Sequence, residues 1–312
     1  MESKQIMHNQ KMGVLDILKK SLLVFGRNNN FNFFTIIASF PMFCFLIYFE
    51  FFLQKFLFDT IETLKPSSDH YFNYFWHYIS DVTEKMNEEN LLQFMQLGFL
   101  YLVPLHLLEL STVLAIVDLA SKIYKKDKPM SLKDMVQKPF NLARMRGTFI
   151  TFVYVTLLSA CTLLGLLWLV TTYFVILRNT MYYVIFAAIC GTSFVPLLGL
   201  HLALSAEWNM SVVISATEGI YGPAALALSS FFSVGSHRRG VILMLVFFVW
   251  GVVLRLPCLY IGCHKGGYAI VAQSFFLCLG NALKWVACMV YFHDCQKQKS
   301  EMKVDGEVGS CG

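Results

Sequence analysis

Six long apolar stretches alternate with shorter polar segments along this chain. Each is long enough to cross a hydrocarbon layer about 30 Å thick as an α-helix, since a helix rises about 1.5 Å per residue. The pattern therefore predicts an all-α fold, a polytopic integral membrane bundle of six transmembrane helices. The predicted spans cover approximately residues 31–54, 94–119, 148–177, 181–205, 240–262 and 268–292.

Amphipathic segments precede the three pairs of spans. Before the first span, Leu15, Leu18, Leu22 and Phe25 recur at helical spacing. We interpret these segments as interfacial helices on the cytosolic face. A threefold repeat of one such helix with two spans is one hypothesis; the simpler alternative is that helices beside a bilayer are commonly amphipathic and basic. The other two segments lie within 132–145 and 223–234, and the three end in Arg27, in Arg144 with Arg146, and in Arg238 with Arg239.

The distribution of Lys and Arg sets the expected orientation. These residues are concentrated in the two termini and in the 120–147 loop, whereas the 55–92 loop is mainly acidic. Because cytosolic loops are enriched in Lys and Arg, both termini are expected in the cytosol. The expected membrane is the endoplasmic reticulum, another endomembrane or the plasma membrane. The predicted regions are a cytosolic amphipathic N-terminal segment (1–30), a six-span membrane domain (31–293) and a flexible cytosolic tail (294–312).

Composition argues against a separate catalytic domain. Hydrophobic residues make up 56% of the chain and charged residues 14%, against about 25% charged residues in a soluble domain. Outside the apolar stretches the longest segment has about 40 residues, which is too short for a typical domain. Signatures of phosphate-binding loops, zinc proteases and serine hydrolases are absent from the sequence. We therefore expect no enzyme activity, no cofactor and no nucleic-acid partner.

Two charged residues, Glu109 and Lys284, lie deep inside the predicted spans. Charges in a bilayer are costly and are therefore usually paired or functional. The two residues lie at matching depths, which predicts an ion pair, with His106 and Asn281 one turn outward on the same faces. This buried polar layer either fixes the register of two helices or forms part of a path for protons, ions or a lipid headgroup. We favour the first interpretation, because a conducting path needs polar groups along its whole length.

Two further pairs match in depth alone. Glu50 and Arg255 lie toward the external side, and Asp118 and His201 lie toward the cytosolic side. Pairing would satisfy these groups, but extension of each side chain to the membrane interface explains their positions equally well.

Cysteine and histidine positions raise two other possibilities. Cys258 and Cys263 flank the last external loop; they would form a disulfide in an oxidising compartment, and two unpaired thiols are an equally weighted alternative. His106 and Glu109 are spaced like metal ligands, but a structural zinc site needs four. No metal site is therefore expected.

The stretch 207–240 carries the most distinctive pattern of the chain. Together with Leu18-x-x-Ser21 and Arg27-Asn28, it resembles a family of plant six-span membrane proteins of unknown function, which is distantly similar to the membrane domain found beside bacterial glycerophosphodiester phosphodiesterases. The resemblance implies the six-span fold but no activity, since the catalytic barrel of those enzymes takes about 250 residues and this chain has no space for it. We expect a turn between two interfacial helices, the first of them anchored by Trp208. The positions that mark this interfacial motif are Trp208, Glu218, Gly219, Gly222, Arg238 and Arg239.

Two functions remain after these exclusions. The first is a non-enzymatic multi-pass membrane protein that interacts with membrane lipids or acts as a scaffold for protein partners. The alternative is a small transporter or channel that uses the buried Glu/Lys layer, helped by mid-span prolines that free backbone groups. A polar cavity that reaches Glu109 would favour the alternative, and a dry bundle with a lateral groove would favour the first function.

Overall fold

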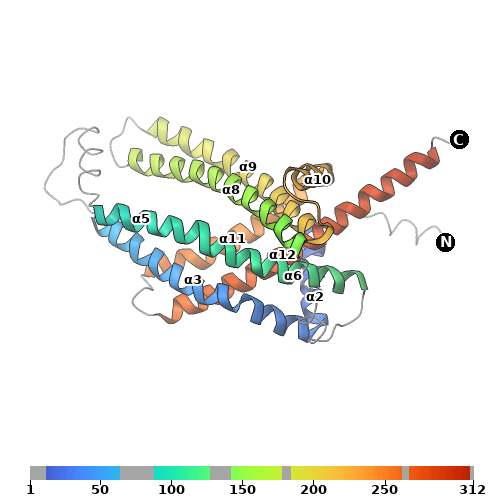
Figure 1. Cartoon of the computed structure of the whole chain (residues 1–312). Coiled ribbons are helices and arrows are strands. Elements are labelled where there is room, and N and C mark those ends of the chain that lie inside the picture. Colours follow the sequence, from blue (N-terminus) through green and yellow to red (C-terminus); the bar gives the residue numbers. More distant parts are fainter. Residues whose placement is uncertain (1–11, 64–87, 127–141, 178–183, 262–266, 310–312) are drawn as a thin grey trace.

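The structure is a computed structural model that describes residues 12–63, 88–126, 142–177, 184–261 and 267–309. Within these ranges the chain is helical apart from short turns, and no strand occurs in them (Figure 1). The elements are α2 (Val14–Arg27), α3 (Asn29–Thr63), α5 (Glu88–Leu100), the π-helical turn η1 (Tyr101–Leu105), α6 (His106–Lys126), α8 (Leu142–Leu177), α9 (Val184–Glu218), α10 (Pro223–Ser233), α11 (His237–Ile261) and α12 (Tyr268–Gly309).

Among the described residues, six helical segments are long and apolar enough to cross a membrane, in agreement with the predicted number of spans. The second of them runs through α5, η1 and α6. Its π-helical turn contains Pro104, and a proline inside a helix removes one backbone donor and displaces the preceding turn. The six segments are Asn29–Phe56, Met95–Lys125, Arg144–Leu166, Gly191–Glu218, His237–Cys258 and Tyr268–Glu301.

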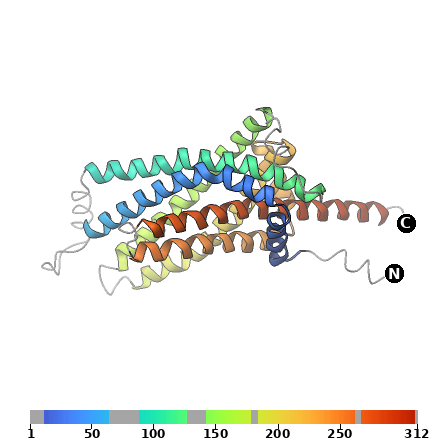
Figure 2. The ribbon, with the colours of Figure 1, turned by 90° about the horizontal axis from the view of Figure 1, so that it is seen from below.

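The long helices run along a common direction, and α2 and the end of α12 lie at one end of the bundle (Figures 1 and 2). We call this end the terminal end; α10 also lies there. The short helix α2 lies across the direction of the spans (Figure 2). Helix α12 is central, because it packs against α2, α3, α6, α9 and α11, whereas α8 packs mainly against α9.

The core is concentrated around α12 and the last part of α9. All residues from Trp285 to Phe292 are buried, so this part of α12 is enclosed on every side. The outer faces of α8 and α11, in contrast, expose large apolar side chains such as Trp168 and Val253. Apolar patches of this extent are typical of a membrane-facing surface.

The fourth span is longer than predicted, and Trp208 does not anchor an interfacial helix. Helix α9 continues without a break to Glu218. Trp208 is buried and packs edge-on against His201, with ring centroids 6.4 Å apart. The polar residues that suggested a membrane interface here have partners inside the protein; Glu207, for example, accepts a hydrogen bond from Ser233 at 3.0 Å.

The segment 294–309, for which we predicted a flexible cytosolic tail, is helical in the structure. It continues α12, and Asp294 and Cys295 at its start are buried. Asp294 accepts hydrogen bonds of 2.6 Å from both Arg239 and Gln298. Arg239 is far away in the sequence and Gln298 is one helical turn further along α12. The hydropathy of the segment could therefore not show that Asp294 is bound inside the protein.

A tight turn joins α9 to α10 at the expected glycines. Gly219 and Gly222 have φ angles of 77° and 65°, a region that other residues rarely adopt. Pro223 then opens α10, where its missing donor has no cost. The backbone N–H of Gly222 donates to the hydroxyl of Thr151 on α8 at 2.8 Å, which ties the turn to the bundle.

Candidate functional site

The ion pair predicted from matching depths is present between α6 and α12. Nζ of Lys284 lies 3.1 Å from Oε1 of Glu109, midway along both spans. Trp285 donates its indole N–H to the same oxygen at 3.2 Å. The side chains of Glu109 and Lys284 nevertheless keep 18% and 23% of their surface exposed. They therefore border a space inside the bundle.

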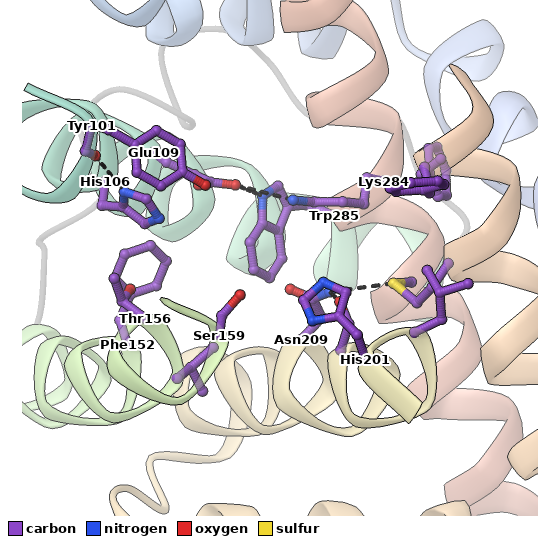
Figure 3. Close-up of a pocket in the computed structure, with 16 residues that line it drawn as sticks. Tyr101, His106, Glu109, Phe152, Thr156, Ser159, His201, Asn209, Lys284 and Trp285 are labelled. Carbon is purple, nitrogen blue, oxygen red and sulfur yellow. Dashed lines mark hydrogen bonds and ion pairs between the residues drawn. The ribbon is translucent and has the colours of Figure 1, made fainter. Parts of the chain in front are cut away.

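This space is a cavity of about 260 Å³ between η1, α6, α8, α9, α11 and α12. Figure 3 shows its side chains converging from α6 and α12 on one side and from α8 and α9 on the other. Its apolar part includes Phe152, Met244 and Phe247. Polar groups make up the rest of the lining, namely Tyr101, His106, Glu109, Thr156, Ser159, His201, Ser205, Asn209, Lys284 and Trp285.

His106 is held at one end of the cavity by the π-helical turn. Its Nδ1 lies 2.7 Å from the backbone oxygen of Tyr101, and the two rings are in edge contact at 4.8 Å. A carbonyl oxygen only accepts hydrogen bonds, so Nδ1 must carry the proton. When the ring is neutral, Nε2 of His106 is therefore an acceptor.

His201 on α9 has the same tautomer for a different reason. Thr162 lies 2.8 Å from its Nδ1 and donates its own hydroxyl hydrogen to the backbone oxygen of Ser159 at 2.9 Å. A threonine hydroxyl has one hydrogen, so when Thr162 donates it to Ser159 it accepts from Nδ1 of His201. In this arrangement Nε2 of the neutral ring is an acceptor, as in His106.

Two hydroxyl groups of α8 are available in the cavity. The side chains of Thr156 and Ser159 line it and make no hydrogen bond with any residue that the structure describes. Serine and threonine in a helix commonly bond to a carbonyl of the preceding turn, as Thr151 does with Gly147 at 3.2 Å. Thr156 and Ser159 are drawn beside the cavity in Figure 3, where they can bind a guest.

Asn281 lies outside this cavity, which corrects the four-residue polar layer expected from the sequence. Its side-chain nitrogen is 3.7 Å from the sulfur of Met42 on α3. Three residues along a helix rotate the side chain by about 300°, which is about 60° short of a full turn. Asn281 therefore faces α3, while Lys284 faces α6. Sequence reasoning in turn missed Thr156, Ser159, His201 and Asn209 as members of the site, because small polar residues in spans usually have structural roles.

The second predicted depth pair, Glu50 with Arg255, is also present and lies apart from the cavity. Nε and Nη2 of Arg255 reach Oε1 of Glu50 at 2.9 and 2.6 Å. Gln273 donates to the other oxygen at 3.0 Å and itself accepts from Gln54 at 3.2 Å. This network joins α3, α11 and α12 near the end of the bundle opposite the terminal end.

The third depth pair does not form. Asp118 instead contacts Lys122 at 3.0 Å and Arg144 at 3.7 Å, while His201 contacts Thr162. Equal depth brings two residues to one level, but their helices must also turn the two side chains toward each other.

The expected interfacial motif divides into inward and outward residues. Arg239 reaches the backbone oxygen of Met12 at 3.0 Å and Asp294 at 2.6 Å, and its side chain is only 14% exposed. Arg238 is exposed. Glu218 accepts a hydrogen bond from Gln296 on α12 at 2.8 Å. Most of this motif therefore ties α9, α11 and α12 together at the terminal end.

Two other sequence predictions concern cysteines and metals. Cys258 is buried at the end of the fifth span, while Cys263 lies outside the described residues, so the disulfide stays a prediction. Among the residues that the structure describes, no three His, Cys, Asp or Glu side chains are grouped in a way that could hold a metal ion.

Comparison with known proteins identifies a family. A family model described as a domain of unknown function (DUF8558) matches residues 1–292, and the chain belongs to this family. No curated protein and no solved structure matches the chain. The family description names no activity, so a functional conclusion must rest on the chemistry of the cavity.

Proposed function

We propose that this member of the DUF8558 family is a non-enzymatic membrane protein that binds a small polar solute at the middle of its bundle and moves it across the bilayer. One observation carries the proposal: the Glu109–Lys284 pair borders a cavity of about 260 Å³ with further polar lining. The cavity reverses the order of the two functions that the sequence suggested.

The state of the ion pair supports solute binding. A pair that only fixes helix register needs close packing and partners for all of its polar atoms, because desolvated charges are costly. Here one oxygen of Glu109 takes both hydrogen bonds, from Lys284 and from Trp285. The charged groups thus retain unused bonding capacity that faces an open space.

The polar lining also extends along the bundle and is not a single layer. On α9 it runs from His201 through Ser205 to Asn209, which is about 12 Å along a helix. The Glu50–Arg255 network lies toward one end of the bundle, and the Arg239–Asp294 contact lies at the other. Polar groups therefore occur at several levels of the bundle, which supports a path for a polar solute.

Water access tests the proposal without a known solute. Hydroxyl-radical footprinting of the protein in nanodiscs should oxidise Met244 on α11 faster than Met289 on α12. Met244 lines the cavity, whereas Met289 is fully buried away from it. Osmotic swelling of proteoliposomes in glycerol, urea or glycine should be faster than that of empty vesicles. Equal protection of the two methionines, together with no added permeability, would refute the proposal.

A second candidate function, interaction with membrane lipids, is favoured by helix α2. Its inner face buries Ile17, Ser21 and Val24. Leu15 and Leu22 lie on another face and are 81% and 57% exposed. Because α2 lies across the spans (Figure 2), this leucine face suits the boundary between headgroups and acyl chains. We therefore propose that α2 is an interfacial helix.

Photo-crosslinking can test this placement. Benzoylphenylalanine introduced at Leu22 should crosslink to phospholipid, whereas the same residue at Lys20, which is exposed and lies off the leucine face, should crosslink much less. Mass spectrometry of the adducts gives the readout. Equal lipid adducts at both positions would argue against an oriented interfacial helix.

Orientation and ancestry belong to the same proposal. The terminal end carries Arg27, Arg144 and Arg238, and cytosolic ends of membrane proteins are rich in arginine and lysine. We therefore propose that both termini face the cytosol, with the protein in the endoplasmic reticulum, another endomembrane or the plasma membrane.

We also propose that the fold is related to the plant six-span family and to the membrane domain beside bacterial glycerophosphodiester phosphodiesterases, without their activity.

A further inference from the structure

We infer that the cavity binds a small zwitterion, a ligand that carries an ammonium group and an anionic group a few bonds apart. The inference rests on the proposed function and deepens it by naming the class of ligand. Its basis is the juxtaposition of Glu109 and Lys284 with the free hydroxyls of Thr156 and Ser159 in one cavity.

Both signs of charge are available to a guest at this place. The ammonium of Lys284 has three hydrogens; one is directed to Glu109, and the group also lies 4.7 Å from the centre of the Trp285 ring. Oε2 of Glu109 accepts no hydrogen bond from any residue in the described part of the chain. A ligand can therefore donate to the carboxylate and accept from the ammonium without breaking their contact.

Charge neutrality favours a ligand with no net charge. With both imidazoles neutral, the ionised groups around the cavity are Glu109 and Lys284, whose charges cancel. A cation or an anion would leave an uncompensated charge in a region of low dielectric, which is strongly unfavourable. A zwitterion keeps the site neutral, and each of its ends can face a group of opposite sign.

Secondary partners exist for both ends of such a ligand. Nε2 of His106, one turn from Glu109 on α6, can accept from an ammonium group, since its Nδ1 is bonded to Tyr101. The hydroxyls of Thr156 and Ser159 on α8 can donate to an anionic group. With Glu109 and Lys284, these groups make five polar partners for one ligand, and a few convergent polar groups are typical of a specific small-molecule site.

The volume limits the size of the ligand. A cavity of about 260 Å³ corresponds to about nine water molecules at about 30 Å³ each. Glycine or β-alanine fits this space, but a whole phospholipid does not. The same chemistry occurs in a free solute and in the headgroup of a zwitterionic lipid, so the experiment must distinguish these two sources.

Thermal unfolding of the full chain in detergent micelles tests the ligand class. The probes are glycine and β-alanine as zwitterions, with ethanolamine, acetate and phosphate as singly signed ions of similar size. We expect at least one zwitterion to raise Tm by a few degrees at saturation, since a ligand that binds only the native state stabilises it. We expect no such rise with the ions.

Matched variants connect the shift to the cavity. The double variant Thr156→Val, Ser159→Ala should weaken zwitterion binding by about tenfold or more, because two hydrogen bonds to the ligand are lost. Its Tm without ligand should hardly change, as neither hydroxyl is bonded within the described protein. Thr192→Val, at an exposed threonine on α9 outside the cavity, is the control and should bind like the native chain.

Nanodiscs separate a lipid headgroup from a free solute. If the headgroup is the natural ligand, phosphatidylethanolamine added to phosphatidylglycerol should raise Tm, and the double variant should abolish the rise; a free solute would act in phosphatidylglycerol alone. Either outcome supports the inference. Equal shifts with ions and zwitterions, or no shift with any probe in either medium, would overturn it. If the inference failed in this way but Met244 were still oxidised faster than Met289, water would reach the cavity and the proposed function would stand.

Discussion

Lys284 on α12 and Glu109 on α6 form an ion pair of 3.1 Å at half the depth of the bundle, and both side chains still border an open cavity. The pair therefore has two roles in our interpretation. It joins two helices that are distant in the sequence, and it supplies charges of both signs to a guest. Stability and ligand binding should respond differently when one partner is replaced.

Replacement of one partner should destabilise the protein more than replacement of both. Glu109→Gln leaves an unpaired ammonium inside the bundle, and Lys284→Met leaves an unpaired carboxylate, so each should lower the free energy of unfolding by about 3 kcal/mol. The double variant should lose clearly less than the sum of the two. Denaturant unfolding in mixed micelles measures the three values.

The Lys297–Glu301 pair provides a control for this cycle. It lies on the same helix, its two side chains are 56% and 38% exposed, and the charged atoms are 3.7 Å apart. Exposed pairs of this kind contribute about 0.5 kcal/mol or less. If the Glu109 and Lys284 replacements were simply additive, the pair would not be coupled as the structure indicates.

Depth along the membrane could be predicted from the sequence, but direction around each helix could not. A span crosses the bilayer along one axis with a fixed rise, so equal counts along two spans predicted the contact Glu109–Lys284, which is present. Matching depth left two explanations for Glu50 and Arg255, and the structure has the pair. The rotation of each helix depends on its neighbours. For this reason Asn281 faces Met42 instead of the cavity.

Hydropathy also failed to find the ends of two helices. The predicted spans ended at residues 205 and 292, just before Glu207 and Asp294, yet each of these two residues is bound by a residue from another helix, Ser233 and Arg239 respectively. A scale that scores residues one at a time treats a polar group with a partner like one in water. Such tertiary contacts hold α9 beyond residue 205 and the part of α12 just beyond residue 292.

Arg239 should be a strong determinant of stability at the terminal end, whereas Arg238 should not. Arg239 joins Met12, Asp294 and Gln298, and Arg239→Ala leaves Asp294 buried without its cation. We expect a loss of about 3 kcal/mol and faster proteolysis near the start of α2. Arg238→Ala changes an exposed side chain and should cost about 0.5 kcal/mol or less. Similar unfolding free energies for the two variants would contradict the inward role of Arg239.

Gly147 should tolerate no side chain, although it lies in an ordinary helix. A Cβ atom there would lie 2.7 Å from Cδ1 and 3.2 Å from Cβ of Tyr221, in the turn before α10. Gly147→Ala should therefore destabilise the protein by about 1–3 kcal/mol through overpacking. Gly165 on the same helix has open space around it, so Gly165→Ala should be neutral or slightly stabilising. Thermal unfolding of the two variants decides the matter; equal Tm values would mean that the turn can move away.

Asparagines inside and outside the cavity should differ in their effect on solute movement. Asn209 lines the cavity and contacts Ser205 and Met244, so Asn209→Leu removes a polar group and fills space on the solute path. We expect the protein-dependent swelling rate of proteoliposomes to fall by about tenfold, as for the loss of one good hydrogen bond. Asn281→Leu changes a residue that faces Met42 and should keep the native rate. Equal rates for both variants, at equal protein incorporation, would show that solute does not pass through this cavity.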